Sequence, residues 1–140
     1  MQRNTLARLR LLALRDDRRA SAEVRTQQQV LRELEEQERL IAEYRDSIAR
    51  TWTDAPAWMA AYAAAFARAA DHACDMARAE QQRQGRILEQ HLEQWHTVRT
   101  RRRRIEETDA RARQQQERSH EKDQEKERQG QWRPGRDGSG

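Results

Sequence analysis

The residue types that most often carry out chemistry in proteins are sparse in this sequence. The histidines are His72, His91, His96 and His120, and Cys74 is the single cysteine. Two metal ligands on one helix face lie three or four residues apart, and no His–His or His–Cys pair here has that spacing. The sequence also lacks a glycine-rich phosphate loop and a nucleophile motif. We therefore expect a protein that is not an enzyme and uses no metal or cofactor, with Cys74 as a small residue on a helix flank.

The sharpest charge feature is the arginine run at Arg99–Arg104. Such a run could neutralise the phosphates of a nucleic acid, bind an acidic protein, or lie on a solvated helix face beside Glu106, Glu107 and Asp109. Residues 99–140 contain 13 basic and nine acidic residues, so their net charge is only +4. This balance favours the solvated face, then the acidic protein partner, over nucleic acid.

The composition is that of a helical chain rather than of a compact globular domain. Of 140 residues, 37% are charged and 5% aromatic, and the mean hydropathy is -1.31. Ala, Glu, Gln, Leu and Arg, all good helix formers, dominate, which indicates a coiled coil or disorder. One cysteine allows no internal disulfide and fits a reducing compartment. No apolar run has the length of a signal peptide or a membrane span, so we expect a cytoplasmic protein.

The helical pattern is strongly interrupted once before the C-terminal tail, at Thr51–Trp58, which contains Pro56. Proline costs about 3 kcal/mol inside a helix but is tolerated in the first turn, where Thr53 or Asp54 just before it can cap the helix. The fold predicted is all-α. Its parts are a first coiled-coil helix at 1–52, a turn at 53–57, a second coiled-coil helix at 58–128 and a disordered tail at 129–140.

Apolar residues recur at heptad spacing on both predicted helices, which indicates a coiled coil. The first helix has the repeat Leu6, Ala13, Ala20, Gln27, Leu34, Ile41 and Ile48, with a companion series, which includes polar residues, of Val24, Leu31, Glu38, Arg45 and Trp52. The second has Trp58, Tyr62, Phe66, Ala69, Ala73, Met76, Ile87, His91, Trp95, Val98 and Ile105. One antiparallel register places Leu34 opposite Met76 and Leu6 opposite Ile105. We therefore predict an antiparallel hairpin within one chain, with a parallel dimer as the alternative.

In this register the N-terminal end of the first helix lies opposite Ile105, whereas the second helix continues beyond it. Residues 106–128 contain no helix breaker, and Ala110 and Ala112 are their only apolar residues. The overhang would be about 30 Å long, and an isolated helix this polar is marginal in water. We expect it either to fray or to bind a partner.

Two apolar clusters each have two interpretations. Trp52 and Trp58 flank the turn and either plug the end of the hairpin, which we favour, or form an exposed tip that docks on another protein. The N-terminal leucines are apolar on more than one face, and a two-helix hairpin covers only one of them. The uncovered face is a candidate contact site, unless it is a fraying amphipathic terminus. These leucines are Leu6, Leu9, Leu11, Leu12 and Leu14.

With these features the chain resembles the FliJ/YscO-type central stalk proteins of flagellar and virulence type III secretion ATPases. The resemblance covers about residues 1–125 and lies in the length, the start Leu6-Ala-Arg-Leu-Arg-Leu-Leu12, the Trp-bearing turn and the longer second helix. Its closest local match is Glu35–Ile48. It implies a non-enzymatic antiparallel coiled coil whose end bearing both termini enters the hexameric ATPase ring, promotes its assembly and couples it to the export gate and export chaperones.

The resemblance also implies sites and partners. Export-gate contacts are expected at Gln37, Ile41, Tyr44, Ile48, Phe66, Ala70, Ala73 and Ala77, although burial in the coiled coil could also explain several of them. ATPase-ring contacts are expected at Leu6, Leu9, Leu12, Arg101, Arg102, Arg103 and Arg104. The expected partners are the secretion ATPase hexamer, the cytoplasmic domain of the export-gate membrane protein and export chaperones, at the inner-membrane export apparatus, without nucleic acid or membrane insertion. The alternatives are an export chaperone or general coiled-coil adaptor and, less favoured, a basic nucleic-acid-binding coiled coil.

Overall fold

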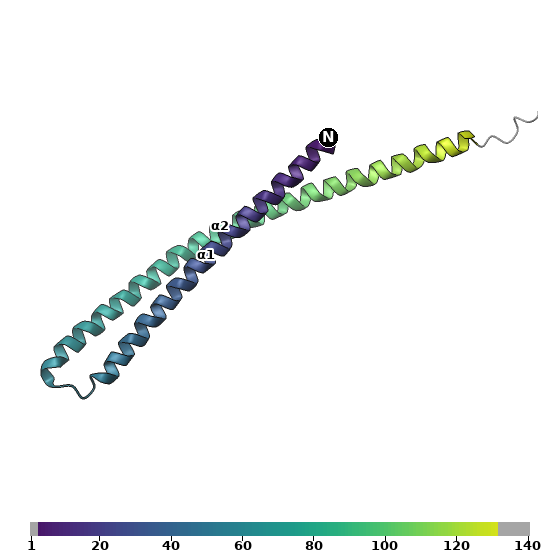
Figure 1. The fold of residues 1–140 in the computed structure, drawn as a ribbon. Helices are drawn as coiled ribbons and strands as arrows, with labels where there is room; N and C mark the ends of the chain where they lie inside the picture. Colours follow the sequence, from purple (N-terminus) through teal and green to yellow (C-terminus); the bar gives the residue numbers. More distant parts are fainter. Residues whose placement is uncertain (1–2, 132–140) are drawn as a thin grey trace, which may run out of the picture. The chain divides into compact units, whose positions relative to one another are not determined.

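Two long helices joined by a short turn make up the described part of the protein. The computed structural model describes residues 3–131, with side chains for 3–130. Helix α1 spans Arg3–Thr51 and helix α2 spans Ala57–Gln131 (Figure 1). The prediction of an all-α antiparallel coiled-coil hairpin is confirmed. Of the tail predicted at 129–140, residues 129–131 belong to α2, and the rest lies outside the described residues.

The turn between the helices forms close to where proline predicts it. The backbone N–H of Met59 donates to the carbonyl oxygen of Pro56 at 2.9 Å, so Pro56 opens the first turn of α2. Proline fits this place because its missing N–H would have no helical partner there. Thr53 does not cap α2 as expected, since its hydroxyl donates back to the carbonyl oxygen of Ala49 at 2.8 Å. Thr53 therefore stabilises the end of α1 instead.

The contacts divide the chain into two units. The hairpin unit is Asp17–Val98 and contains the turn. The terminal unit comprises Met1–Asp16 and Arg99–Gly140, of which residues 3–16 and 99–131 are described. Each unit pairs a stretch of α1 with a stretch of α2, so each is described by its own contacts.

The core of the hairpin unit is a line of small side chains. Ala20, Val24, Ala70, Cys74 and Ala77 are buried, and among the described residues no large side chain is fully buried. Two helices cannot enclose a large side chain on all sides, whereas small residues let their backbones approach closely and exclude water. The apolar area buried per residue is modest, so packing here stabilises the pair by less than a globular core would.

The predicted heptad on α1 is confirmed, because every repeat position from Leu6 to Ile48 is buried or half-buried. On α2 the prediction is right for Phe66, Ala73 and the series from Ile87 to Ile105, but wrong for Trp58, Tyr62, Ala69 and Met76, which are exposed. The predicted contact residues Trp58, Tyr62 and Met76 are 69%, 69% and 61% exposed. The contact is made instead by Ala70, Cys74 and Ala77, spaced by four and three residues on a neighbouring stripe of the helix. Cys74 is therefore a core residue and not a flank residue.

The terminal unit continues the pairing further than the sequence predicts. Leu6 and Ala13 are buried, and Arg10 of α1 reaches Asp109 of α2, beyond Ile105. Residues 113–130 of α2 are all exposed. The unpaired part of α2 thus starts after Arg113 rather than at residue 106, and residues 114–131 are called the extension below. They remain helical, over about 27 Å at 1.5 Å per residue.

Candidate interaction sites

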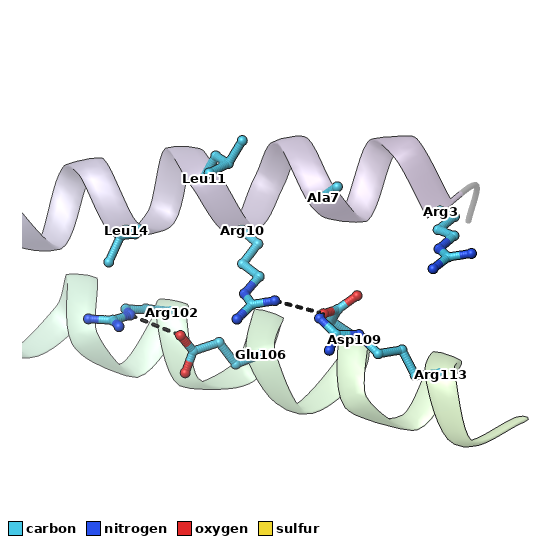
Figure 2. Close-up of a pocket in the computed structure, with 9 residues that line it drawn as sticks. All are labelled: Arg3, Ala7, Arg10, Leu11, Leu14, Arg102, Glu106, Asp109 and Arg113. Carbon is cyan, nitrogen blue, oxygen red and sulfur yellow. Dashed lines mark hydrogen bonds and ion pairs between the residues drawn. The ribbon is translucent and has the colours of Figure 1, made fainter. Parts of the chain in front are cut away.

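A groove lies between α1 and α2 in the terminal unit (Figure 2). Its volume is about 560 Å³. The apolar part of its lining comes from α1, and arginines line it on both helices. The lining residues, which define the terminal groove, are Arg3, Ala7, Arg10, Leu11, Leu14, Arg102, Glu106, Asp109 and Arg113.

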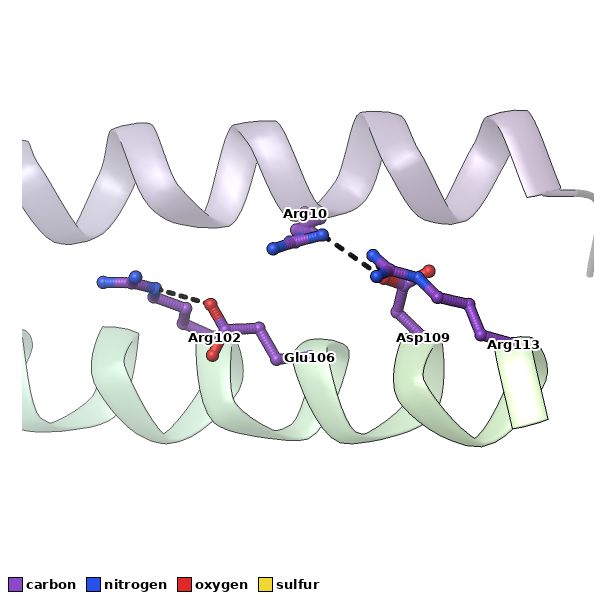
Figure 3. A network of polar contacts seen from close by, with 5 residues as sticks. All are labelled: Arg10, Arg102, Glu106, Asp109 and Arg113. Atoms are coloured by element: carbon purple, nitrogen blue, oxygen red, sulfur yellow. Dashed lines mark hydrogen bonds and ion pairs between the residues drawn. The ribbon is translucent and has the colours of Figure 1, made fainter.

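Ion pairs occupy the charged side of the terminal groove (Figure 3). Asp109 accepts from Arg113 at 2.5 Å and lies 3.5 Å from the Nη1 atom of Arg10 across the groove, and its side chain is only 13% exposed. Arg102 donates through Nε to Glu106 at 3.0 Å. Both acidic side chains of the groove are thus engaged by arginines, and four arginines against two acids leave the lining net basic.

The residues predicted to contact an ATPase ring fall into three groups by exposure in the terminal unit. Leu6 is only 5% exposed and packs between the helices, so it cannot serve as a surface contact in this fold. Leu9 and Arg102 are half-buried. The accessible members are Leu12, which is 46% exposed, and the arginines Arg101, Arg103 and Arg104. Leu11, 68% exposed, is the most accessible of the N-terminal leucines, which confirms that one apolar face of α1 stays uncovered.

A second candidate site is an exposed apolar surface in the hairpin unit. Leu40 and Tyr44 of α1 are 52% and 62% exposed. On α2, Tyr62, Ala69 and Met76 recur every seven residues and are all exposed, so they form one stripe. A shallow groove of about 400 Å³ joins the two helices here, lined by Leu40, Ile41, Tyr44, Phe66, Ala69 and Ala70. Leu40, Tyr44, Trp58, Tyr62, Ala69 and Met76 are called the apolar surface below.

The aromatic plug that we favoured for the end of the hairpin is only partly formed. Trp52 and Phe66 are half-buried, with ring centroids 6.4 Å apart, and Tyr44 meets Phe66 edge to face at 5.5 Å. Trp58, however, is 69% exposed to solvent. The interpretation of Trp58 as a plug is therefore wrong, and its exposure fits the alternative of a docking tip.

The residues expected to contact an export gate differ in exposure between the two helices. On α1, Gln37 and Tyr44 are exposed and Ile41 and Ile48 are half-buried. On α2, Phe66 and Ala73 are half-buried, whereas Ala70 and Ala77 are buried between the helices. Burial in the helix contact accounts for the alanines of α2, because a residue covered by the partner helix cannot also meet another protein. Of the α1 residues, Gln37 and Ile41 line a groove beside Leu40, and Ile41 and Tyr44 line the groove shared with Phe66.

Polar pairs cross between the helices near the apolar surface, and the heptad pattern does not predict which residues they join. Glu38 of α1 accepts from Arg78 Nε at 2.6 Å and from Gln81 Nε2 at 2.7 Å. These two hydrogen bonds, that from Arg78 first, lower the pKa of the Glu38 carboxyl. Arg45 and Asp71 form a further cross-helix ion pair at 2.9 Å. Such pairs have defined partners, so they favour one register of the two helices over others.

Two more polar contacts lie inside the helix contact itself. Asp17 is 8% exposed and accepts from Trp95 Nε1 at 2.7 Å. Gln27 is 9% exposed, and its amide donates to the side chain of Gln84 at 2.5 Å and to the Gln84 carbonyl oxygen at 3.1 Å. A buried polar group that loses its partner costs more than the hydrogen bond contributes. Sliding one helix along the other would separate these pairs, so they specify the register.

Among residues 3–131, no three His, Cys, Asp or Glu side chains are grouped so that they could hold a metal ion. Neither helix, over its described length, is long and apolar enough to cross a bilayer. No family model, curated protein or solved structure significantly matches the chain. The geometry offers two surfaces, the terminal unit with its basic groove and extension, and the apolar surface of the hairpin unit.

Proposed function

We propose that this chain is a non-enzymatic central stalk of a type III protein-export ATPase, flagellar or virulence-associated. It promotes assembly of the ATPase ring and couples the ring to the export gate and to export chaperones. One observation carries the proposal: in the terminal unit a helix pair with exposed arginines gives way, after Arg113, to a single helix with no apolar face. A slender polar helix of this kind suits the interior of a ring better than it suits an independent fold.

The proposed stalk acts through binding alone. Arg101, Arg103 and Arg104 are exposed at the paired part of α2, where they can meet acidic side chains lining a ring. A ring whose subunits change conformation during the ATP cycle presents different contacts to the stalk in each state. Because a ligand shifts an equilibrium by its differential affinity for the two states, contacts that favour the assembled ring raise its population and its turnover.

The apolar surface supplies the second contact that coupling needs. Tyr44 and Leu40 lie exposed at the groove that they share with Phe66. Exposed aromatic residues beside a small pocket are typical anchors at protein interfaces. In the proposed function this surface binds the cytoplasmic domain of the export gate or an export chaperone while the terminal unit occupies the ring.

The experiment that tests the proposal measures ATP hydrolysis and hexamer formation by the export ATPase of the same genome. Full-length chain should raise both, in a saturable way. Removing residues 114–140 should abolish the stimulation while circular dichroism still reports the paired hairpin. Unchanged stimulation by the truncated chain would refute the placement of the ring contact on the extension, and failure of the full-length chain to stimulate would refute the stalk function.

A charge-matched pair of variants sharpens the test. The triple variant Arg101→Gln, Arg103→Gln, Arg104→Gln removes three exposed charges from the terminal unit. At a few tenths to 1 kcal/mol each, the concentration for half-maximal stimulation should rise about tenfold. The control replaces exposed Arg50, Arg68 and Arg86 of the hairpin unit by Gln, which removes the same charge elsewhere. Equal losses in both variants would mean that only the total charge matters.

The exposed apolar surface specifically favours one second candidate, a coiled-coil adaptor or export chaperone. A surface of aromatic and aliphatic side chains in solvent can bind an unfolded or helical client. In that case Tyr44→Ser with Tyr62→Ser should abolish binding of an export substrate, and the chain should leave ATP hydrolysis unchanged. Stimulation of the ATPase without any client binding would decide against this candidate.

A further inference from the structure

The positive charge of the protein is concentrated in the paired part of the terminal unit. Residues 1–16 and 99–113 contain eleven arginines and four acidic residues, a net charge of +7, although the whole chain carries only +4. The remainder is therefore net acidic. Of the four acids, Glu106 and Asp109 are turned into the terminal groove and engaged there by Arg102, Arg10 and Arg113. The outer faces of this part are left strongly basic.

One of these outer faces, which borders the terminal groove at Leu11, combines arginine with leucine. Arg8, Leu11, Leu12 and Arg15 lie within about one-third of the circumference of α1 at 3.6 residues per turn, and all four are exposed. No acidic residue precedes Asp16 in the sequence. The ion pair from Arg15 to Asp16 is long at 4.0 Å, and the Arg15 side chain is 70% exposed. These four residues are called the outer face of α1.

We propose that the outer face of α1 binds the surface of a lipid bilayer rich in anionic phospholipids. Arginine pairs well with phosphate because its guanidinium donates two parallel hydrogen bonds. Leucines placed between the arginines fit the boundary between headgroups and acyl chains, where a basic amphipathic helix lies in the plane of the membrane. Neither a nucleic acid nor a polar protein surface offers a comparable place for two exposed leucines, which is why lipid is favoured.

The fold allows this contact without unpairing the helices. Leu6 and Ala13, on the opposite side of α1, are buried against α2. Leu11 and Leu12 can therefore enter the lipid interface while the pairing that holds the terminal unit stays intact. With two leucines and a few arginines, we expect α1 to lie parallel to the membrane surface. This binding does not depend on the stalk function proposed above.

Flotation of the full-length chain with lipid vesicles tests the proposal. Vesicles of 30% phosphatidylglycerol in phosphatidylcholine should carry the protein upward at low salt, and pure phosphatidylcholine vesicles should not. The variant Arg8→Gln with Arg15→Gln should lower the partition coefficient at least about tenfold, because each arginine near an anionic surface contributes about a fivefold effect. The control Arg68→Gln with Arg86→Gln removes the same charge from the hairpin unit and should change the partitioning little.

A second variant separates lipid contact from simple attraction to polyanions. Leu11→Ser with Leu12→Ser keeps every charge and should weaken flotation about tenfold, while binding to a short DNA duplex, measured in parallel, stays the same. Three results would overturn the proposal: no flotation with anionic vesicles, flotation unaffected by the leucine variant, or DNA binding that exceeds vesicle binding at equal salt. ATPase stimulation is measured on the same variants, so that failure of the stalk function is recognised separately.

Discussion

Replacing Trp95 by Phe tests how much the buried polar contacts hold the two helices together. The indole Nε1 donates to Asp17 Oδ1 at 2.7 Å, and Asp17 is only 8% exposed. Phe keeps most of the ring but has no donor. A hydrogen bond to a charged group contributes about 1.5–3 kcal/mol, so Trp95→Phe should lower the free energy of unfolding by that amount. For a chain of this size, 1 kcal/mol corresponds to about 4 °C, and Tm should fall by about 6–12 °C.

The chain contains its own control for this change. Trp58 is 69% exposed and takes part in neither the helix contact nor a polar pair with Asp17. Thermal unfolding followed by circular dichroism at 222 nm should therefore show Trp58→Phe within about 1 °C of the unmodified protein. If Trp95→Phe and Trp58→Phe unfold at the same temperature, the reasoning about buried polar contacts is refuted. A double-mutant cycle with Asp17→Asn would then show no coupling.

Three further changes have defined outcomes. Gly85→Ala should raise the free energy of unfolding by about 0.5–1 kcal/mol in urea titration, because a Cβ there meets no atom within 4 Å and alanine is the better helix former; a loss of stability would contradict it. Ala77→Leu should lower it by about 1–3 kcal/mol by overpacking a residue that is 8% exposed, whereas Ala79→Leu, on the exposed side, should change little. The pKa of Glu38 is lowered from its ordinary value of 4.5 in the folded protein, so its ionised carboxylate stabilises the fold. This stabilisation is complete above pH 4.5 and is lost as the pH falls through the lower pKa of the folded state. Glu38→Gln should therefore lose less stability than the unmodified chain between pH 5 and about pH 3, measured by urea unfolding at each pH.

The sequence predicts the fold well where residue types differ sharply between helix faces. On α1, small and apolar residues alternate with Arg, Glu and Gln, so the heptad from Leu6 to Ile48 identifies the contact face correctly. The turn is predictable for a similar reason, since Pro56 has few places where it fits a helix. Near the start of α2, by contrast, alanine occurs on every face. The aromatic residues Trp58 and Tyr62 then suggest a stripe that the structure leaves in solvent.

Polar contacts between the two helices could not be predicted from the sequence in the same way. The pairs Asp17–Trp95 and Gln27–Gln84 need the correct register before their members can be matched, and polar residues usually indicate a solvated face. The helix pairing beyond Ile105 was missed for the same reason. In the sequence Asp109 resembles a surface acid, and only the folded pair shows Arg10 opposite it. The accessible leucines and arginines of the terminal unit were predictable, because a two-helix contact leaves most of each helix circumference uncovered.

The reactivity of the single thiol, Cys74, reports on the opening of the hairpin unit. Cys74 lies 8% exposed among alanines, where a labelling reagent can reach its sulfur only after the two helices move apart. Because the chain has one cysteine, the rate at which the thiol reacts measures a single event, the opening of the hairpin unit around that position. Any molecule that binds the closed pair slows this reaction, and one that binds separated helices accelerates it.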